Sequence, residues 1–245
     1  MSFVPTVLAA VLLAGLVSLG LWQLRRAEEK TQLIERATSR AEDPPYRLGS
    51  DSVLPSEAMS KLEFRRVVAT GRYDSVHQYL LDNRTHAGQA GFEVLTQLEL
   101  GRGTGVLVNR GWIASSGHRD RLPVLPVPVG PVEVSGQFAR PRENRLVLGP
   151  SGYEEAAAWP RIVQRIELDP MSKALGHQLV PLVVLLDPSS PDGFERDWRP
   201  HLGISPARHW AYAFQWFALA AALVVLYIFH ARRSPGTRAV ARRNR

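Results

Sequence analysis

Two long stretches without a charged side chain lie near the ends of the chain, Ser2–Leu24 and Trp210–Phe229. At about 1.5 Å per helical residue, each is long enough to cross the ~30 Å hydrocarbon core of a bilayer. Aromatic side chains stand at both ends of the second stretch, as interfacial belts require. The first has no basic segment before it and no A-x-A site after it, which disfavours a cleaved signal peptide. We therefore predict two transmembrane helices, residues 3–24 and 209–230.

The middle of the chain is made of short β-rich runs with turn residues between them. Their pattern predicts strands at Arg66–Tyr73, Gln78–Asp82, Gly91–Leu100, Gly105–Ile113, Pro131–Arg140, Trp159–Ile166 and Val180–Asp187. Seven closely spaced strands favour a mainly antiparallel β-sheet or a small β-barrel. The alternation in Val106–Gly111 predicts one packed face and one more polar face for that strand.

Helices and connectors complete the prediction for the middle segment. Gln32–Arg40 continues the first helix as a polar stalk, which Asp43-Pro44-Pro45 ends because proline disfavours helical geometry in the preceding residue. Short helices are expected at Ser56–Leu62 and at Asp169–Leu175, the second ended by Gly176.

Two glycine- or proline-rich segments are expected to be connections. Gly101–Gly105 superficially resembles a phosphate loop, but it opens no helix, so a hairpin turn is expected. Pro123–Pro131 alternates proline with apolar residues and is expected to be an extended connector.

Together these elements predict a membrane-anchored α+β protein in which two transmembrane helices flank the β-rich domain. The expected organisation is transmembrane helix 1 at 3–24, a stalk at 25–45, the β-rich domain at 46–208, transmembrane helix 2 at 209–230 and a basic tail at 231–245.

The net charge of +7 comes mostly from the C-terminal tail. Six arginines and no acid lie in the last sixteen residues, while the remainder is nearly neutral. This distribution favours a tail at a membrane surface and disfavours a nucleic-acid groove. By the positive-inside rule both termini are expected in the cytoplasm, with the domain on the other side. Arg25, Arg26 and Lys30 oppose this orientation, but Glu28 and Glu29 are interleaved with them.

Motifs for catalysis are missing from the sequence. The chain has no cysteine, which excludes zinc ribbons, iron–sulfur clusters and thiol chemistry. Its seven histidines form no H-E-x-x-H motif, and no G-x-S-x-G elbow is present. We therefore expect a protein that is not an enzyme and that has no protein-only metal site.

Two residues remain as candidates for binding. His209 precedes the second apolar stretch and shares a helical stripe with Tyr212 and Trp216. Its imidazole is either an interfacial group among lipid headgroups or a ligand of a haem iron whose macrocycle lies against those aromatic rings. Arg110 is either a clamp for a ligand carboxylate or part of a structural ion pair, and Trp112 is equally well explained as a core residue.

Seven motifs follow one another along the chain: Leu19–Arg26 with Lys30, Glu63–Val67, Gly71–Tyr73, Leu81–Arg84, Gly91–Thr96, Val106–Ile113 and His209–Phe217. In this order they resemble the surfeit locus protein 1 family of cytochrome c oxidase assembly factors. Gln97 and Ala114 depart from the family pattern, since proline is frequent at both positions. The resemblance covers nearly the whole chain, and Val108–Trp112 is its specific motif.

The resemblance implies a multi-pass protein of a bacterial inner membrane, with a periplasmic domain, that helps to assemble haem–copper oxidase. It implies transient binding of haem a, with His209 as the iron ligand beside Tyr212 and Trp216. The implied partners are oxidase subunit I and other oxidase assembly factors. The residues expected to serve partner contact or structure are Trp22, Gln23, Arg25, Arg66, Asn109, Arg110, Gly111 and Trp112.

An alternative of another class is a haem-free scaffold that docks its helices and domain onto oxidase subunits. The small residues Ala10, Ala14 and Ser18 at four-residue spacing would then form a close-packing helix face.

Overall fold

A computed structural model describes residues 3–52, 54, 56–115, 122–141, 158–198 and 205–233, without the side chains of residues 56–58 and 233. The chain divides into a helical unit, residues 1–35 and 200–245, and a β-rich unit, residues 36–199. The predicted basic tail from residue 234 onward lies outside the described residues.

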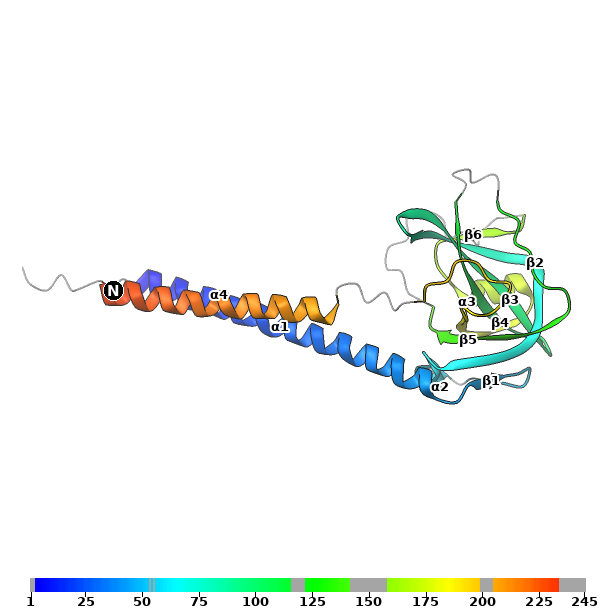
Figure 1. Cartoon of the computed structure of the whole chain (residues 1–245), viewed down its shortest axis with the longest axis horizontal. Coiled ribbons are helices and arrows are strands. Elements are labelled where there is room, and N and C mark those ends of the chain that lie inside the picture. The colour runs from blue at the N-terminus through cyan, green and yellow to red at the C-terminus, as the bar shows by residue number, and fades with distance from the viewer. Residues whose placement is uncertain are drawn as a thin grey trace, which may run out of the picture. The chain divides into compact units, whose positions relative to one another are not determined.

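Two helices, α1 (Phe3–Glu42) and α4 (Pro206–Arg233), are long and apolar enough to cross a membrane (Figure 1). Only 6% and 11% of their apolar windows are buried, so neither is the core helix of a soluble protein. As predicted, α1 continues past its apolar part and ends before Asp43-Pro44-Pro45. Helix α4 begins at Pro206, a favourable first position, where Ser205 Oγ accepts the Arg208 N–H at 3.4 Å. The predicted membrane bounds, 3–24 and 209–230, stay predictions.

Within the helical unit, α1 and α4 are antiparallel and approach closely. Gly20 is buried, and a Cβ atom there would lie 2.7 Å from Cζ of Phe217. Thr6 Oγ1 and the Tyr227 hydroxyl form a hydrogen bond of 2.9 Å farther along the pair. Small residues at such a contact allow two backbones to pack closely in lipid.

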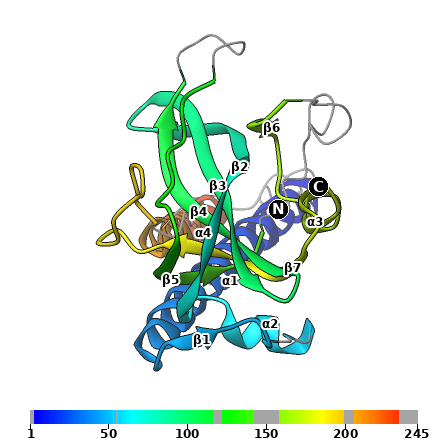
Figure 2. The same ribbon diagram turned by 90° about the vertical axis from the view of Figure 1, so that its right-hand side faces the viewer.

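The β-rich unit is built on a closed ring of five strands, in the order β2–β3–β4–β7–β5 and back to β2 (Figures 1 and 2). All ring pairings are antiparallel except β4–β7. Two further strands, β1 and β6, pair with β2 in parallel. The strands are β1 (Tyr46–Leu48), β2 (Arg66–His86), β3 (Gln89–Gly101), β4 (Thr104–Ala114), β5 (Pro131–Ala139), β6 (Arg161–Val163) and β7 (Gln178–Leu186). The predicted fold class, with its small barrel, is confirmed.

Two of the predicted strands are one strand, β2. The register shifts between Tyr73 and Gln78, and the carboxylate of Asp74 accepts hydrogen bonds from the backbone N–H groups of Val76 and His77 there. This local bond satisfies the backbone where the ladder is interrupted, so the strand bends without ending. The first half of β2 pairs with β5 and the second half with β3 and β6.

Apolar side chains from all five ring strands fill the barrel interior. They are Val67 and Ala69 of β2, Leu98 of β3, Val106 and Val108 of β4, Val134 and Phe138 of β5, and Val180, Leu182, Val184 and Leu186 of β7. A second cluster covers the opposite face of the sheet and includes Tyr79, Leu107, Val163 and Met171. Helix α3 (Leu168–Leu175) lies beside β7 (Figure 2) and contributes Met171 to that cluster.

The prediction that β4 has one more polar face is wrong. Residues 105–111 are all buried, because Val106 and Val108 point into the barrel and Leu107 packs in the cluster under α3. Asn109, on that same supposedly polar face, is also buried and bonds to the Glu93 carboxylate, so polarity did not indicate exposure.

The predicted helices and turns agree with the structure. Helix α2 occupies Ser56–Leu62, and Gly176 ends α3 with a φ of 69°. Gly101–Gly105 forms the β3–β4 hairpin, with positive φ at Arg102 and Gly103. The connector before β5 contains no helix or strand in its described part, and its Leu125 is buried.

Replacing Phe138 with alanine will destabilise the barrel. Its side chain is fully buried in the interior, so Phe138→Ala should lower the free energy of unfolding by about 3–5 kcal/mol. The free energy of unfolding is measured by denaturant titration of the full chain in detergent, with hydrogen exchange of the barrel amides as the readout. The control Val129→Ala removes a fully exposed side chain and should change little; equal effects of the two substitutions would contradict the assigned interior.

Candidate functional site

His209 lies in the first turn of α4 and is buried against α1, with 6% of its surface exposed. Its Nδ1 forms a hydrogen bond of 2.6 Å with Oε1 of Gln23 on α1. Ala213 and Ala220, one and three turns farther along α4, are buried on the same side. The histidine therefore belongs to the packed face of the helix pair.

The aromatic residues predicted beside His209 do not share that face equally. Trp216 is half-buried, whereas 46% of Tyr212 is exposed. Of the N-terminal motif, Gln23 forms a hydrogen bond with His209, whereas Trp22 is 51% exposed and Arg25 is exposed as well. The structure thus adds one partner to the predicted haem site, Gln23, and places Tyr212 on the outer surface.

The chemistry of this pair fits an iron ligand. An amide oxygen only accepts hydrogen bonds, so the geometry puts the proton of a neutral His209 ring on Nδ1. The lone pair of the ring then lies on Nε2, the kind of nitrogen that ligates haem iron. Among the described residues no group of three or more His, Asp or Glu side chains is arranged to hold a metal ion.

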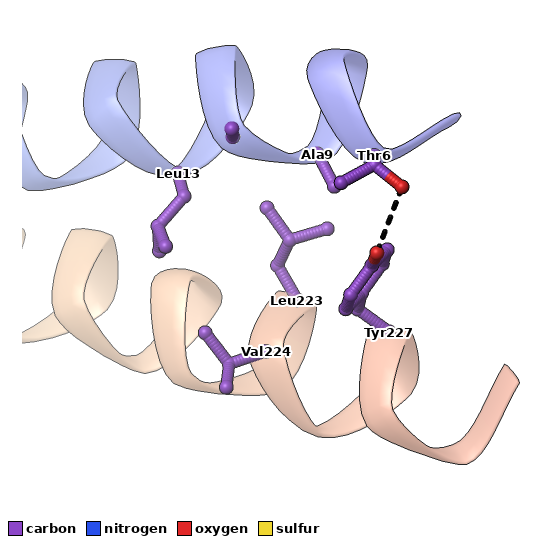
Figure 3. Close-up of a pocket in the computed structure, with 7 residues that line it drawn as sticks. Thr6, Ala9, Leu13, Leu223, Val224 and Tyr227 are labelled. Carbon is purple, nitrogen blue, oxygen red and sulfur yellow. Dashed lines mark hydrogen bonds between the residues drawn. The ribbon is translucent and has the colours of Figure 1, made fainter. Parts of the chain in front are cut away.

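An apolar cleft of about 260 Å³ lies between α1 and α4 near the other end of the pair (Figure 3). It is lined by Thr6, Ala9, Ala10, Leu13, Leu223, Val224 and Tyr227. The hydroxyl groups of Thr6 and Tyr227, which line the cleft, are bonded to each other. The other side chains that line it are hydrocarbon. The cleft therefore offers packing to apolar groups and no acid–base chemistry.

Arg110 is buried in the β-rich unit, with 1% of its surface exposed. Its guanidinium donates to the backbone oxygen of Asp192 from Nε (2.9 Å) and from Nη2, and to that of Pro126 from Nη2 (2.7 Å). It also lies about 5 Å from the ring centroids of Tyr73 and Phe194, at 5.3 and 5.1 Å. These hydrogen bonds go to carbonyls, so Arg110 ties β4 to two loops. A clamp on a ligand carboxylate stays a prediction.

Burial also shifts the ionisation of this cluster. Desolvation lowers the pKa of Arg110, although the neighbouring Tyr73 and Asp192 oppose the shift. Desolvation raises the pKa of Tyr73 to about 12, against the opposing charge of Arg110. The guanidinium nevertheless keeps its charge, because arginine is not deprotonated in proteins. Arg110 is thus a structural cation held by carbonyl dipoles and ring faces.

The neighbours of Arg110 in β4, Asn109, Gly111 and Trp112, also connect this strand to other segments, and the region around them is called the β4 corner. Asn109 donates to Glu93 Oε2 at 2.7 Å and accepts the Gly111 N–H at 3.1 Å. Gly111 has a φ of 114°, and a Cβ atom there would lie 2.6 Å from the Glu195 oxygen. Trp112 exchanges backbone hydrogen bonds with Glu195, at 2.7 and 3.1 Å. The Val108–Trp112 motif therefore stabilises the fold in this structure. Arg66, another residue expected to serve partner contact or structure, lies exposed at the start of β2.

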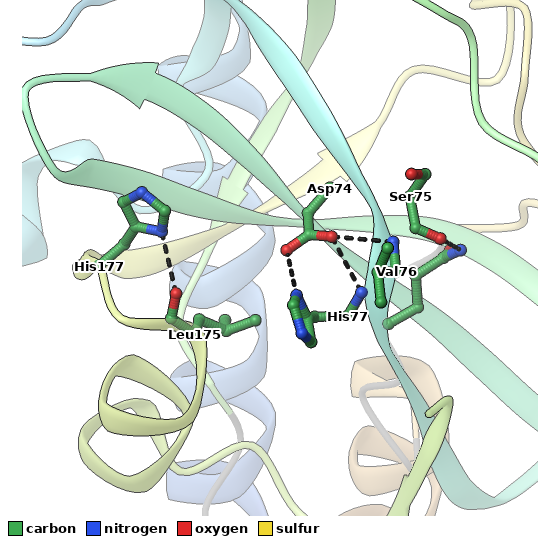
Figure 4. Close-up of polar contacts among 7 residues, drawn as sticks. Asp74, Ser75, Val76, His77, Leu175 and His177 are labelled. Atoms are coloured by element: carbon green, nitrogen blue, oxygen red, sulfur yellow. Dashed lines mark hydrogen bonds and ion pairs between the residues drawn. The ribbon is translucent and has the colours of Figure 1, made fainter. Parts of the chain in front are cut away.

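A polar cluster at the bend of β2 was missed from the sequence (Figure 4). Asp74 Oδ2 bonds to Nδ1 of His77 at 2.7 Å, and Oδ1 accepts two backbone N–H groups, at 2.8 and 2.9 Å. The His77 ring meets the Trp159 ring edge-on, with centroids 4.8 Å apart. Burial disfavours the Asp74 carboxylate, but these hydrogen bonds outweigh it and lower its pKa. An aspartate between two strand-like runs was the available signal.

Most of this chain matches one known protein family. The model of the SURF1 family matches residues 10–221, which include Gln23, Arg110 and His209. This protein belongs to the SURF1 family. The resemblance stated from its motifs is thereby confirmed.

Relatives of this SURF1-family chain come from bacteria and eukaryotes. A SURF1-like protein of Rickettsia bellii is 27% identical over 94% of this chain and 91% of its own length. Surfeit locus protein 1 of Rattus norvegicus is 27% identical over 89% of this chain and 73% of its own. A SURF1-like protein of Dictyostelium discoideum is 38% identical, but that match covers 40% of this chain and 38% of the relative.

Replacing Arg110 with lysine will destabilise the β-rich unit of this SURF1-family protein. A lysine ammonium cannot reproduce the planar fork between the Asp192 and Pro126 oxygens, so Arg110→Lys should cost about 2–4 kcal/mol. Denaturant unfolding of the full chain measures the cost. Arg72→Lys changes an exposed arginine of β2 and serves as the control; a loss for Arg110→Lys no larger than that control's would argue against the structural role.

Replacing Asp74 with asparagine will remove a pH-dependent part of the stability. Because the folded-state pKa of Asp74 is lowered, its stabilisation is present above the ordinary pKa and is lost as the pH falls through the folded value. Asp74→Asn should therefore cost about 1–2 kcal/mol at neutral pH, and the cost should shrink in acid. Unfolding curves at several pH values measure this. Asp51→Asn, in an exposed pair with Arg102, should cost little at any pH; a pH-independent loss for Asp74→Asn would refute the assignment.

Proposed function

We propose that this protein is a membrane-anchored assembly factor for cytochrome c oxidase that assists the placement of haem a in subunit I. Membership of the SURF1 family over residues 10–221 supports the assembly role. The two apolar helices support a place in the membrane. Other assembly factors are expected partners. The proposal assigns no catalytic residue.

The buried His209 is the observation that carries the haem part of the proposal. It is held at the start of α4 with Nδ1 bonded to Gln23, so that Nε2 carries the lone pair. Haem a, when bound, would supply an iron that accepts a nitrogen ligand, and Nε2 of His209 would be that ligand. Trp216 and Tyr212 lie within two turns of His209 on α4. The half-buried Trp216 would offer its ring to an apolar macrocycle, and the exposed Tyr212 would flank it from the outer surface. A single neutral nitrogen suits a cargo that must be released.

The same proposal includes the location and orientation of the chain. We place it in a bacterial inner membrane with both termini in the cytoplasm and the barrel in the periplasm. The arginine-rich tail without acids supports this orientation by the positive-inside rule. Bacterial relatives of nearly full length, such as the one from Rickettsia bellii, support the bacterial setting.

A second candidate is a scaffold that docks onto oxidase subunits and binds no haem. The exposed small residues of α1 favour it, because Ala10, Ala14 and Ser18 are all exposed, although Ala10 also borders the cleft between α1 and α4. Such a stripe permits close approach of another transmembrane helix. The two candidates differ in whether purified protein retains haem a and in whether His209 matters for function.

Deleting the gene should selectively remove the haem a band from reduced-minus-oxidised membrane spectra. The b-type and c-type bands should remain, because only haem a placement is assigned to this protein. A plasmid with the wild-type gene should restore the band, and His209→Ala should restore it poorly. His230→Ala, which changes an exposed histidine of the same helix, is the control.

The outcomes separate the two candidates. Full restoration by His209→Ala, with haem-free purified protein, would refute the haem part and favour the scaffold. An unchanged spectrum after deletion of this gene and of any second copy would overturn the assembly role itself.

A further inference from the structure

We infer that Gln23 is the positioning residue of the proposed haem site: it fixes the His209 ring as the Nδ1–H tautomer and leaves Nε2 as the nitrogen that binds iron. The iron-binding half of this inference rests on the proposed function. The tautomer half rests on the contact between the two side chains.

The contact between Gln23 and His209 indicates one tautomer. Oε1 of Gln23 and Nδ1 of His209 are 2.6 Å apart, a short hydrogen bond in which the oxygen can only accept. His209 as a residue is only 6% exposed, so water does not readily replace this partner. The His209 ring has one hydrogen-bond partner among the described residues, Gln23. A neutral ring bonded in this way presents an unprotonated Nε2.

Gln23 lies between two packed positions of α1, one helical turn before it and one turn after it. Gly20 lies one turn before it and lets Phe217 of α4 approach, since a Cβ atom at residue 20 would lie 2.7 Å from that ring. Ala27 lies one turn after it and is fully buried. Gln23 is therefore the polar position in a row of small residues on the packed face of α1. Its side chain lies between the helices and bonds across them.

A neutral amide also suits the release of a cargo. A carboxylate bonded to a ligating histidine raises the basicity of the ring and strengthens its bond to the metal. An amide oxygen orients the ring with much less charge transfer. Gln23 therefore provides orientation and a fixed tautomer while keeping the iron bond weak enough for transfer to subunit I.

The tautomer is tested on the full chain in nanodiscs with ¹⁵N-labelled histidine. His209→Ala identifies the His209 signals by their loss. Wild type should show the Nδ1–H form, and Gln23→Leu should shift His209 toward a mixture of tautomers. Gln32→Leu, at a glutamine of α1 that bonds Glu28 on the exposed surface, should leave the signals unchanged. An Nε2–H ring in wild type, or no change in Gln23→Leu, would overturn the inference.

The effect on iron binding is tested by titrating the same proteins with haem a and recording absorbance. Gln23→Leu should weaken binding by about 10–100-fold, as loss of a partner behind a metal-bound histidine does elsewhere. Gln23→Glu should restore affinity and lower the midpoint potential, because a carboxylate makes the ring more basic. Gln32→Leu should bind as wild type does.

A merely structural role for Gln23 predicts a different result. Leucine and glutamate would then weaken haem binding together with the thermal stability of the helix pair, and the midpoint potential would not move. If wild type and His209→Ala bind no haem a, the haem part of the proposed function fails. The NMR comparison still decides whether Gln23 sets the tautomer.

Discussion

Closure of the strand ring is the constraint on which the β-rich unit depends. Strand β5 pairs with β7 on one side and with β2 on the other, and β2, which bends near Asp74, pairs with both β3 and β5. Once the ring closes, every ring strand has partners on both sides, and alternate side chains from all five strands meet inside. The packing of Phe138 follows from this closure.

Arg110 shows how a charge is accommodated beside that interior. Its hydrogen bonds go to main-chain oxygens of two irregular segments that run past β4, and its flat surface meets two rings. A single planar cation thus satisfies main-chain carbonyls of segments that lie outside the strands. The adjacent glycine and tryptophan complete the corner by pairing β4 with Glu195. The group that looked most like a ligand clamp organises loops.

Local signals predicted most elements, and contacts distant in sequence explain the failures. Backbone geometry fixed three boundaries that the sequence predicts. Asp43-Pro44-Pro45 ends α1, Gly176 ends α3, and Gly101–Gly105 makes the turn between β3 and β4. The bend of β2 looked like a strand end because an aspartate also marks turns. The burial of Asn109 depends on a carboxylate of β3, and the pairing of Gln23 with His209 joins residues 186 positions apart. Periodicity within one segment contains no information about such partners.

Two hydrogen bonds between α1 and α4, Thr6–Tyr227 and Gln23–His209, fix how the two helices are aligned along their axes. Thr6 and Gln23 are separated by 17 positions on one helix, and His209 and Tyr227 by 18 on the other. At 1.5 Å per residue both intervals are about 26 Å, close to the thickness of a bilayer's hydrocarbon core. Sliding one helix past the other would break both bonds at once. The pair therefore has a fixed apolar length, and a thicker or thinner membrane must be met by tilting both helices together or by deforming the lipid around them.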